Sequence, residues 1–238
     1  MKLFSKLSFV GAVLVLSTGF ASATSYQLGS YGTTSGNFGN QNSPMVFLPG
    51  ISQGGPFVPS TNFTFNIPAT APWNSALTGT SSWISYADTS PGSSLPFAPN
   101  GSYFFTTTFT LDAQATSYSI NLLADDTVAV YLDLNGLLSN QVAAFSTGPN
   151  VTCQTVLPNC TTVFTASNNP AILNLLTAGS HTLFFQVVQA QSQAMGLDWT
   201  GTVTTASTAV PEPGTLFLLG IGLVGSAGTV MRRGRASK

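Results

Sequence analysis

Two stretches of the chain, Tyr103–Leu111 (YFFTTTFTL) and Thr127–Leu134 (TVAVYLDL), carry the pattern that decides the fold. In both of them apolar side chains fall on alternate positions, which is the period of a β-strand with one buried face. The same alternation recurs in residues 183–187 and 197–203. Because such a face is buried only against a second sheet, the pattern predicts an all-β fold, a jelly-roll-like antiparallel β-sandwich.

Turn-forming residues separate these apolar runs. Asn100-Gly101, Asn135-Gly136 and Ala178-Gly179-Ser180 each lie between two predicted strands. No stretch between them keeps the 3.6-residue period of an amphipathic helix, so we expect helices to be few and short. One folded domain over residues 24–205 follows from this organisation.

The charges of the chain are strongly partitioned. All six Lys and Arg lie within the first six or the last seven residues, whereas residues 24–210 keep six Asp and no Lys or Arg. A protein that binds nucleic acid needs cations to displace counterions from the phosphates. The composition therefore excludes direct binding of DNA or RNA by the body of the protein.

Residues 1–23 are typical of a secretory signal peptide. Two lysines precede a short apolar run, and Ala21 and Ala23 supply the small side chains of a signal peptidase cleavage site. The alternative is a retained membrane anchor, which needs about 20 apolar residues, more than this run has. We predict that signal peptidase removes the segment and that the mature chain begins near Thr24.

The C-terminal region consists of three parts in a fixed order. A linker, residues 206–213, contains Pro211-Glu212-Pro213, and an uncharged stretch of 18 residues, 214–231, follows it. As a helix that stretch would be about 27 Å long, enough to cross a thin bilayer. The basic tail, residues 232–238, follows and contains the arginines Arg232, Arg233 and Arg235. By the positive-inside rule these arginines keep the tail in the cytoplasm and place the body outside.

This order of parts at the end of a chain resembles the PEP-CTERM sorting signal of Gram-negative bacteria. The resemblance implies recognition by exosortase, a membrane-embedded cysteine protease that cuts near the Pro-Glu-Pro motif. Pro211, Glu212 and Pro213 would then be recognition residues for another enzyme and not catalytic residues of this protein. It also implies an intermediate in the inner membrane, followed by release to the cell surface or the extracellular matrix.

A second resemblance covers about residues 73–204. The succession of Tyr103–Phe109, Ala124–Leu132, Asn135-Gly136 and Ala178–Leu183 is similar to that of bacterial surface β-sandwiches of the galactose-binding-like type. Some members of that group bind carbohydrate, and many have no known ligand. The resemblance supports the predicted sandwich more than it supports any binding activity.

Three residues are candidates for a ligand or metal site. Asp125 and Asp126 are adjacent carboxylates that calcium, a cation with oxygen ligands, could use. The alternative is a turn in which an Asp side chain caps backbone N–H groups. Tyr131 lies on the parity opposite the apolar face of its strand, where its ring would stack on a sugar or pack against the protein. We otherwise expect no cofactor.

Catalytic chemistry has little support in the sequence. His181 is the only histidine, and the chain lacks the Gly-x-Ser-x-Gly motif of a serine hydrolase. We expect His181 to begin a strand after a turn, with at most one hydrogen bond, so that Asn could replace it at a cost of about 1 kcal/mol or less. The body also has no Glu and no cation to position an acid. We therefore predict that the protein is not an enzyme, with a surface hydrolase as a remote alternative.

The two cysteines, Cys153 and Cys160, are seven residues apart. In an exported protein an even number of cysteines favours a disulfide, which would close a small loop here. Two free, buried thiols are the alternative.

Together these features predict an exported, non-enzymatic protein of the cell surface or extracellular matrix. We expect it to associate with the exopolysaccharide that accompanies such sorting systems. The alternative is a carbohydrate- or calcium-dependent binding module with a defined ligand.

Overall fold

The computed structural model describes most of the predicted body of the protein. The chain divides into two units, Ala23–Ser207 and the combination of Met1–Ser22 with Thr208–Lys238. All the strands lie in the first unit. The described residues are 22–30, 41–47, 63–69, 73–74, 77, 81–86, 98–133, 140–145, 156–190, 194–206 and 220–222.

The described residues of this unit form eleven strands and one short helix. The strands are β1 (Ser25–Gly29), β2 (Gln41–Phe47), β3 (Phe63–Asn66), β4 (Ile84–Ser85), β5 (Gly101–Leu111), β6 (Ala115–Asp125), β7 (Thr127–Leu132), β8 (Gln141–Ala143), β9 (Phe164–Ser167), β10 (Gly179–Gln189) and β11 (Gly196–Thr205). The helix α1 (Pro170–Leu173) lies between β9 and β10. Its first turn is capped by Asn169, whose side chain accepts a hydrogen bond from the backbone N–H of Ala171.

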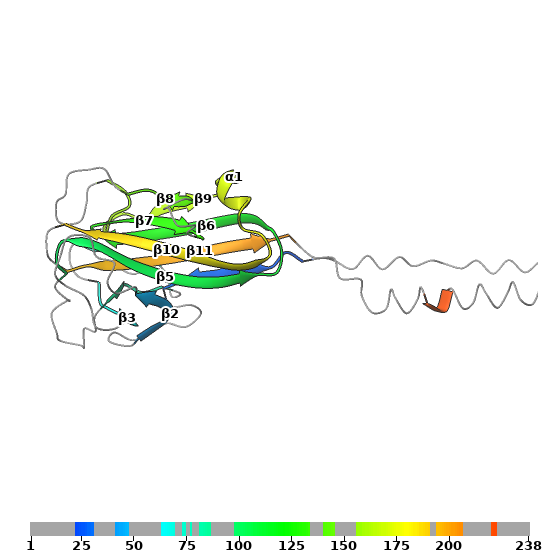
Figure 1. The fold of residues 1–238 in the computed structure, drawn as a ribbon, viewed down its shortest axis with the longest axis horizontal. Coiled ribbons are helices and arrows are strands. Elements are labelled where there is room, and N and C mark those ends of the chain that lie inside the picture. The colour runs from blue at the N-terminus through cyan, green and yellow to red at the C-terminus, as the bar shows by residue number, and fades with distance from the viewer. Residues whose placement is uncertain are drawn as a thin grey trace, which may run out of the picture. The chain divides into compact units, whose positions relative to one another are not determined.

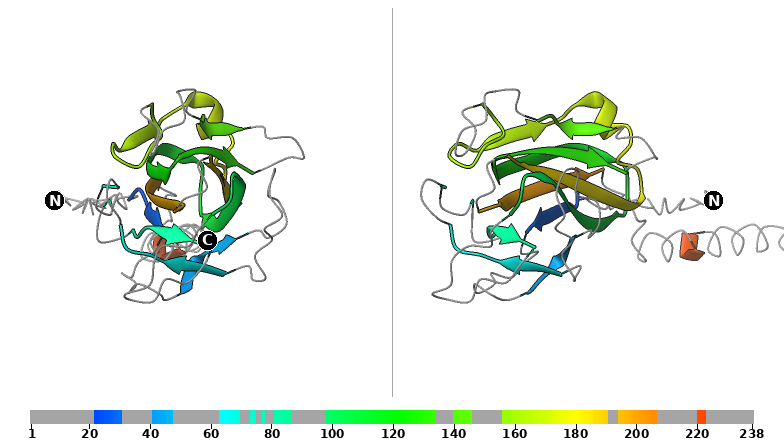
Figure 2. Two further views of the ribbon diagram at one scale, coloured as in Figure 1. Left: turned by 90° about the vertical axis from the view of Figure 1, so that its left-hand side faces the viewer. Right: turned by 60° about the vertical axis from the view of Figure 1, so that its left-hand side comes forward.

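The strands pair in the order β8-β7-β10-β5-β2-β3-β4-β11-β6-β9, and β1 pairs with β11. Every pair is antiparallel. Layers made by β5, β10 and β7 and by β6 and β11 face each other, as the contact between Phe185 and Trp199 shows, with 4.8 Å between ring centroids. Figures 1 and 2 show the strands arranged around this common interior. The prediction of an antiparallel β-sandwich is confirmed.

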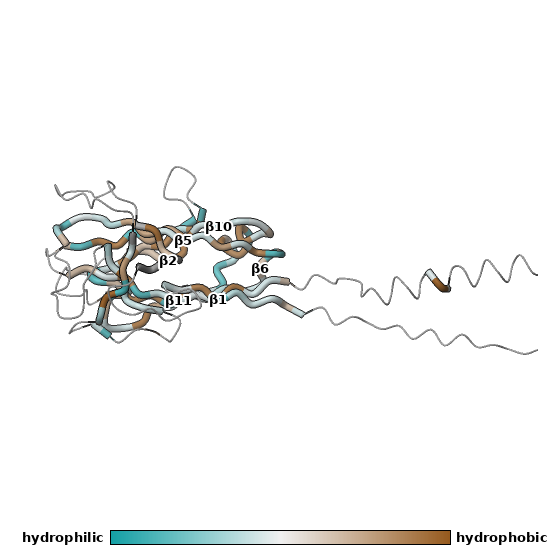
Figure 3. The backbone as a smooth tube through the Cα atoms, turned by 90° about the horizontal axis from the view of Figure 1, so that it is seen from below, coloured by the Kyte–Doolittle hydropathy of each residue, from teal (hydrophilic) through white to brown (hydrophobic). Residues whose placement is uncertain are grey.

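The alternating positions identified in the sequence form the core. In β5, for example, Tyr103 and Phe105 are 2% and 0% exposed. Along the strands in Figure 3 hydrophobic segments alternate with paler, more polar ones. Other buried residues of the predicted faces are Phe109, Leu111, Val128, Val130, Leu132, Leu183, Phe185, Val187, Leu197, Trp199 and Val203.

One feature of the burial differs from the sequence pattern. All six residues of β7 are buried, including Ala129 and Tyr131 on the parity that the alternation leaves open. The last residues of β6 are likewise buried on both faces. A second apolar cluster covers the outer face of β6 and consists of Ile67, Trp73, Trp83, Leu123 and Cys160, with Leu77 and Ala194 packed against it.

The sandwich has two ends that differ in chemistry. At the first, which we call the terminal end, β11 finishes at Thr205 opposite Ala115, next to the start of β1. At the second, which we call the acid-pair end, β6 finishes at Asp125 opposite Gly196, the first residue of β11. The candidate residues Asp125 and Asp126 lie at the acid-pair end, whereas Tyr131 is paired with Phe184 in the middle of β10.

Candidate functional site

The predicted site residues fall into two groups. Ala23, Asp125, Asp126, Tyr131 and Cys160 belong to the described part of the chain. Outside the described residues lie the signal peptide residue Ala21, the cysteine Cys153, the sorting motif Pro211-Glu212-Pro213 and the arginines Arg232, Arg233 and Arg235.

Asp125 closes the acid-pair end from the last position of β6. Its carboxyl group is buried, and Oδ2 accepts a hydrogen bond of 2.6 Å from the indole Nε1 of Trp73. Burial, and then the neighbouring Asp126, raise the pKa of Asp125 to about 7. This carboxyl group is therefore partly protonated at neutral pH, unlike an ordinary aspartate.

Asp126 joins the corner between β6 and β7 to the end of β10. Its side chain is 2% exposed, and Oδ2 accepts a hydrogen bond of 2.8 Å from the backbone N–H of Ala190. Its own backbone N–H donates to the carbonyl oxygen of Val188 at 3.1 Å. The capping of a backbone N–H is the structural role that the sequence offered as the alternative to a ligand role.

Two tryptophans cover this end of the sheet. Trp73 stacks on Trp83 with 4.3 Å between ring centroids, and Trp83 Nε1 donates to the carbonyl oxygen of Asn74 at 3.0 Å. Gly196 lies directly against both rings, because a Cβ atom there would come within 2.7 Å of Trp73 Cη2 and 2.9 Å of Trp83 Cε3. The absence of a side chain at Gly196 thus allows the indoles to reach the backbone and Asp125.

A third buried acid, Asp198, was not singled out by the sequence analysis. Its side chain is fully buried and accepts hydrogen bonds from the backbone N–H of Leu77 at 2.9 Å and from Ser30 Oγ at 3.4 Å. Burial raises its pKa to about 6. The sequence did contain one indication that Asp198 is buried. It lies between two residues of a predicted core strand, Leu197 and Trp199, in a body that has no Lys or Arg.

These acids do not form an evident cation site. Among the described residues there is no group of three or more His, Cys, Asp or Glu side chains that could hold a metal ion. Calcium takes six to eight oxygen ligands and favours charged carboxylates. The raised pKa of Asp125 opposes cation binding, because the proton must leave before the carboxylate can act as a ligand. Within the described residues, Asp126 and Asp198 accept hydrogen bonds from backbone N–H groups of neighbouring segments, an arrangement that holds those segments in place more readily than it binds an ion.

Tyr131 is 4% exposed, and burial raises the pKa of its hydroxyl group. Its strand pairs with β10 on one side and with β8 on the other, where Tyr131 lies opposite Gln141. The ring of Tyr131 therefore packs against the protein and has little exposed surface on which a sugar could stack. Trp73, Trp83 and Tyr86 are buried as well.

His181 is placed differently from the expectation. It lies within β10, 5% exposed, with its ring 5.6 Å from that of Phe109. Nδ1 lies 2.6 Å from Asp133 Oδ2, and Nε2 lies 2.8 Å from the carbonyl oxygen of Thr177. Asp133 Oδ1 also accepts a hydrogen bond of 2.6 Å from the backbone N–H of Thr182. Since the nitrogen that would activate a nucleophile faces a backbone carbonyl, this Asp–His pair is not arranged for general-base catalysis.

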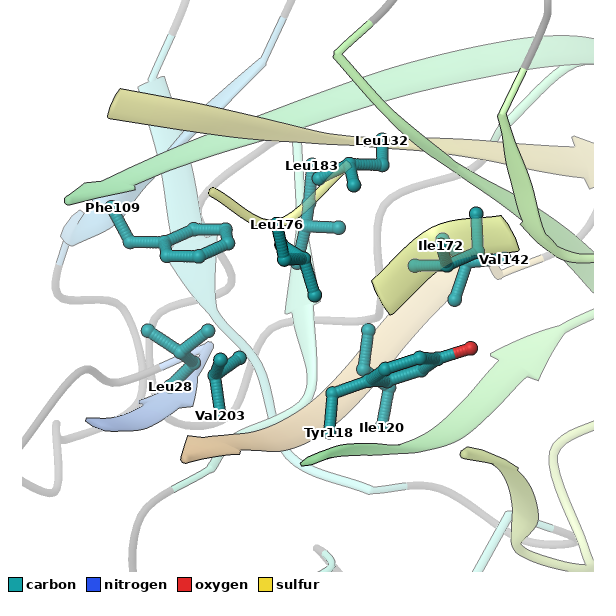
Figure 4. Close-up of a pocket in the computed structure, with 10 residues that line it drawn as sticks. All are labelled: Leu28, Phe109, Tyr118, Ile120, Leu132, Val142, Ile172, Leu176, Leu183 and Val203. Carbon is teal, nitrogen blue, oxygen red and sulfur yellow. The ribbon is translucent and has the colours of Figure 1, made fainter. Parts of the chain in front are cut away.

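A small apolar cavity of about 10 Å³ lies inside the sandwich beneath α1. Apart from Tyr118, whose hydroxyl group Figure 4 shows, the side chains that line it are hydrocarbon, and its volume holds about one water molecule at most. A carbohydrate site needs polar partners for hydroxyl groups and more space, so this cavity is a packing gap. The lining residues are Leu28, Phe109, Tyr118, Ile120, Leu132, Val142, Ile172, Leu176, Leu183 and Val203.

Cys160 belongs to the second apolar cluster and is fully buried. It is disulfide-bonded, and none of the described cysteines is free. Its backbone carbonyl accepts a hydrogen bond of 2.8 Å from the N–H of Asn74, so the cysteine segment is attached to the chain around Trp73. The pairing with Cys153 stays a prediction.

Comparison with known proteins identifies the C-terminal segment. Residues 209–235 match the PEP-CTERM protein-sorting motif, which confirms the resemblance seen in the sequence. Such a motif marks a protein for export to the cell surface through a membrane-anchored intermediate. No helix in the described part of the chain is long and apolar enough to cross a membrane, and of residues 214–231 only 220–222 belong to that part.

The body has more distant similarities. No curated protein matches the chain. Among solved structures, a family 35 carbohydrate-binding module from Clostridium thermocellum aligns with a TM-score of 0.29 and 10% sequence identity, over 76% of this chain and 98% of that one. A similarity at this level carries no inference about a ligand.

Proposed function

We propose that the protein is an exported, non-enzymatic component of the cell surface or extracellular matrix that exosortase sorts through its C-terminal signal. The match of residues 209–235 to the PEP-CTERM motif carries this proposal. Signal peptidase would cut after Ala23, residues 214–231 would span the inner membrane of a Gram-negative host, and Arg232, Arg233 and Arg235 would hold the tail in the cytoplasm. The jelly-roll-like body would then be released outside.

The division of the chain into units supports this route. The body, Ala23–Ser207, forms one unit, and its boundaries lie close to the predicted signal cleavage site and to the linker at 206–213. Both processing events would therefore occur in segments outside the sandwich. The predicted Cys153–Cys160 disulfide fits a protein that matures in an oxidising compartment.

The role we propose for the body is structural association with exopolysaccharide. The titratable side chains that the structure describes support a non-enzymatic role. The carboxyl group of Asp125 accepts a hydrogen bond from Trp73, and both ring nitrogens of His181 contact protein atoms, in Asp133 and Thr177. A neutral polysaccharide is a suitable partner for a body that has no Lys or Arg and in which three of the six Asp, Asp125, Asp126 and Asp198, are buried.

The sorting proposal is tested in the native host by replacing Pro211, Glu212 and Pro213 with Ala. The wild-type protein should be released, begin at Thr24 and lack Arg232 to Lys238, whereas the variant should stay in the membrane fraction. Mass spectrometry of the N- and C-terminal peptides reads both events, and a host without exosortase is the control. Released protein that keeps its C-terminal arginines would contradict the proposal.

Association with polysaccharide is tested separately. Processed protein should co-sediment with the exopolysaccharide of its host and remain in solution without it. A glycan array with and without calcium then distinguishes general association from the alternative. Tight binding of one glycan that needs calcium would favour a specific binding module and would bring Asp125, Asp126 and Tyr131 back as candidate ligands.

A further inference from the structure

The two ends of the body meet at one point of the sandwich. Ser25 in β1 pairs with Thr204 in β11, and the backbone N–H of Thr205 donates to the carbonyl oxygen of Thr24 at 2.9 Å. The first residue of the predicted mature chain therefore lies beside the last residue of the final strand. This contact fixes the position of the Thr24 backbone.

One carboxylate holds both residues. Asp112, in the turn between β5 and β6, accepts hydrogen bonds from Thr24 Oγ1 at 3.1 Å through Oδ2 and from Thr205 Oγ1 at 2.8 Å through Oδ1. Its backbone N–H also donates to the hydroxyl group of Tyr26 at 3.1 Å. Hydrogen bonds from Thr205 and Tyr26 lower the pKa of Asp112, so it carries a full negative charge at neutral pH.

We propose that Asp112 is the binding site for the α-ammonium group that signal cleavage creates on Thr24. The inference rests on the proposed function, because the cation exists only after cleavage at this bond. The new nitrogen is separated by three covalent bonds from Thr24 Oγ1, which already contacts Asp112. Since the Oγ1 contact is 3.1 Å, the nitrogen must lie within about 7 Å of the carboxylate, at or near the range of about 4 to 6 Å in which opposite charges stabilise each other.

The composition of the body makes this ion pair distinctive. Residues 24–210 have no Lys or Arg, so the new α-amino group of Thr24 would be the only primary amine in this part of the chain. His181 is itself paired with Asp133. Maturation thus adds a positive charge where a single carboxylate joins the two ends of the domain. The titratable groups at this junction are Asp112 and Tyr26.

The absence of lysine also supplies the test. In processed protein released by the host, an amine-reactive acylating reagent modifies the N-terminal peptide only at its α-amino group. The pH dependence of that reaction, followed by mass spectrometry, gives the pKa of the amine, which is about 7.7 when unperturbed. We expect the pKa in the wild-type protein to be higher by a few tenths of a unit to about one unit. We expect it to return to the ordinary value in Asp112→Asn.

Two further variants separate charge from structure. Thr205→Val removes one hydrogen bond to Asp112 but keeps the carboxylate, so the raised pKa should persist. Insertion of an Ala between Ala23 and Thr24 displaces the amine from its site without changing Asp112, so the ordinary pKa should return. The insertion variant, and the loss of the shift in high salt, test the proposal even if Asp112→Asn is not exported.

The outcomes distinguish this inference from the proposed function. If the released wild-type protein begins at a residue other than Thr24, the predicted cleavage site and the ion pair are both wrong. If it begins at Thr24 and its amine has the same pKa in the wild type, in Asp112→Asn and in the insertion variant, the ion pair alone is wrong and the sorting proposal stands.

Discussion

An aspartate lies at each end of the sandwich, and the surroundings shift the pKa of the two carboxyl groups in opposite directions. At the acid-pair end Asp125 is buried beneath Trp73, and its pKa is raised to about 7. At the terminal end Asp112 is exposed, and hydrogen-bond donors lower its pKa. Neither carboxyl group has a Lys or Arg partner, because the body contains none. In a body without Lys or Arg, a buried carboxyl group is stabilised by taking up a proton, and an ionised one by accepting hydrogen bonds from N–H and O–H groups.

The largest effect is expected from Trp73→Ala, which breaks the acid-pair end. It removes a buried ring and leaves the carboxyl group of Asp125 without its donor, so the free energy of unfolding should fall by about 5 kcal/mol. Trp73→Phe is the matched control, because it keeps one aromatic ring at this position and loses the pyrrole part of the indole with its N–H. Chemical denaturation measures both variants. Equal stability of Trp73→Ala and the wild type would show that this cluster does not support the fold.

The stability of the protein should depend on pH through the buried acids Asp125 and Asp198. The pKa values of Asp125 and Asp198 are raised from 3.8 to about 7 and about 6, so the folded state binds more protons than the unfolded state in that interval. Stability should therefore decrease by several kcal/mol as the pH rises from about 4 to about 7.

Denaturation curves at several pH values measure this profile, with Asp125→Asn as the comparison. In that variant the decrease should be smaller, because only Asp198 still carries a raised pKa. A wild-type protein whose stability rises with pH over the same interval would contradict the assignment of buried, partly protonated acids.

Gly196→Ala should have a smaller effect at the same end. The added methyl group would lie less than 3 Å from atoms of Trp73 and Trp83, which are rigid and buried, so we expect a loss of about 1 to 3 kcal/mol. Gly201→Ala in the same strand is the control, because its nearest atom outside the adjacent residues is 3.3 Å away, in Trp199. Thermal melting of the two variants should show the larger decrease for Gly196→Ala, and the reverse order would refute the close packing.

His181→Asn should produce the smallest change, about 1 to 2 kcal/mol. An asparagine side chain reaches Asp133 or the carbonyl oxygen of Thr177 but not both, so one of the two contacts of the ring is lost. The sequence alone predicted a smaller loss, because it placed this residue at the start of a strand. If the variant is as stable as the wild type, the two hydrogen bonds contribute little. Loss of a reproducible hydrolytic activity with the fold intact would instead indicate a catalytic role.

The sandwich and its core were accessible from the sequence because alternation reports which face of a strand is buried. Phe105 and Val130 were assigned correctly on this basis. The burial of Tyr131 was not decidable, since the alternation describes one face of a strand and says nothing about what covers the other. The sorting signal was recognisable because its motif is short, ordered and terminal.

The contacts of the candidate residues were less predictable. Trp73 and Asp125 are 52 positions apart, and Asp133 and His181 are 48 apart. No local pattern connects residues at such separations, because their proximity results from the pairing of strands. Asp198 was missed for a related reason, since an acid within an apolar strand signals either a surface position or a bonded, buried one.

The two strands that end the hydrogen-bonded path are short: β8 has three residues and β9 has four. A sheet edge offers unpaired N–H and C=O groups to any other extended chain, and many proteins protect such edges with lysine. This body has no lysine, so the brevity of β8 and β9 limits how far an incoming strand can be added. We therefore expect the protein to resist edge-to-edge aggregation when it is concentrated outside the cell.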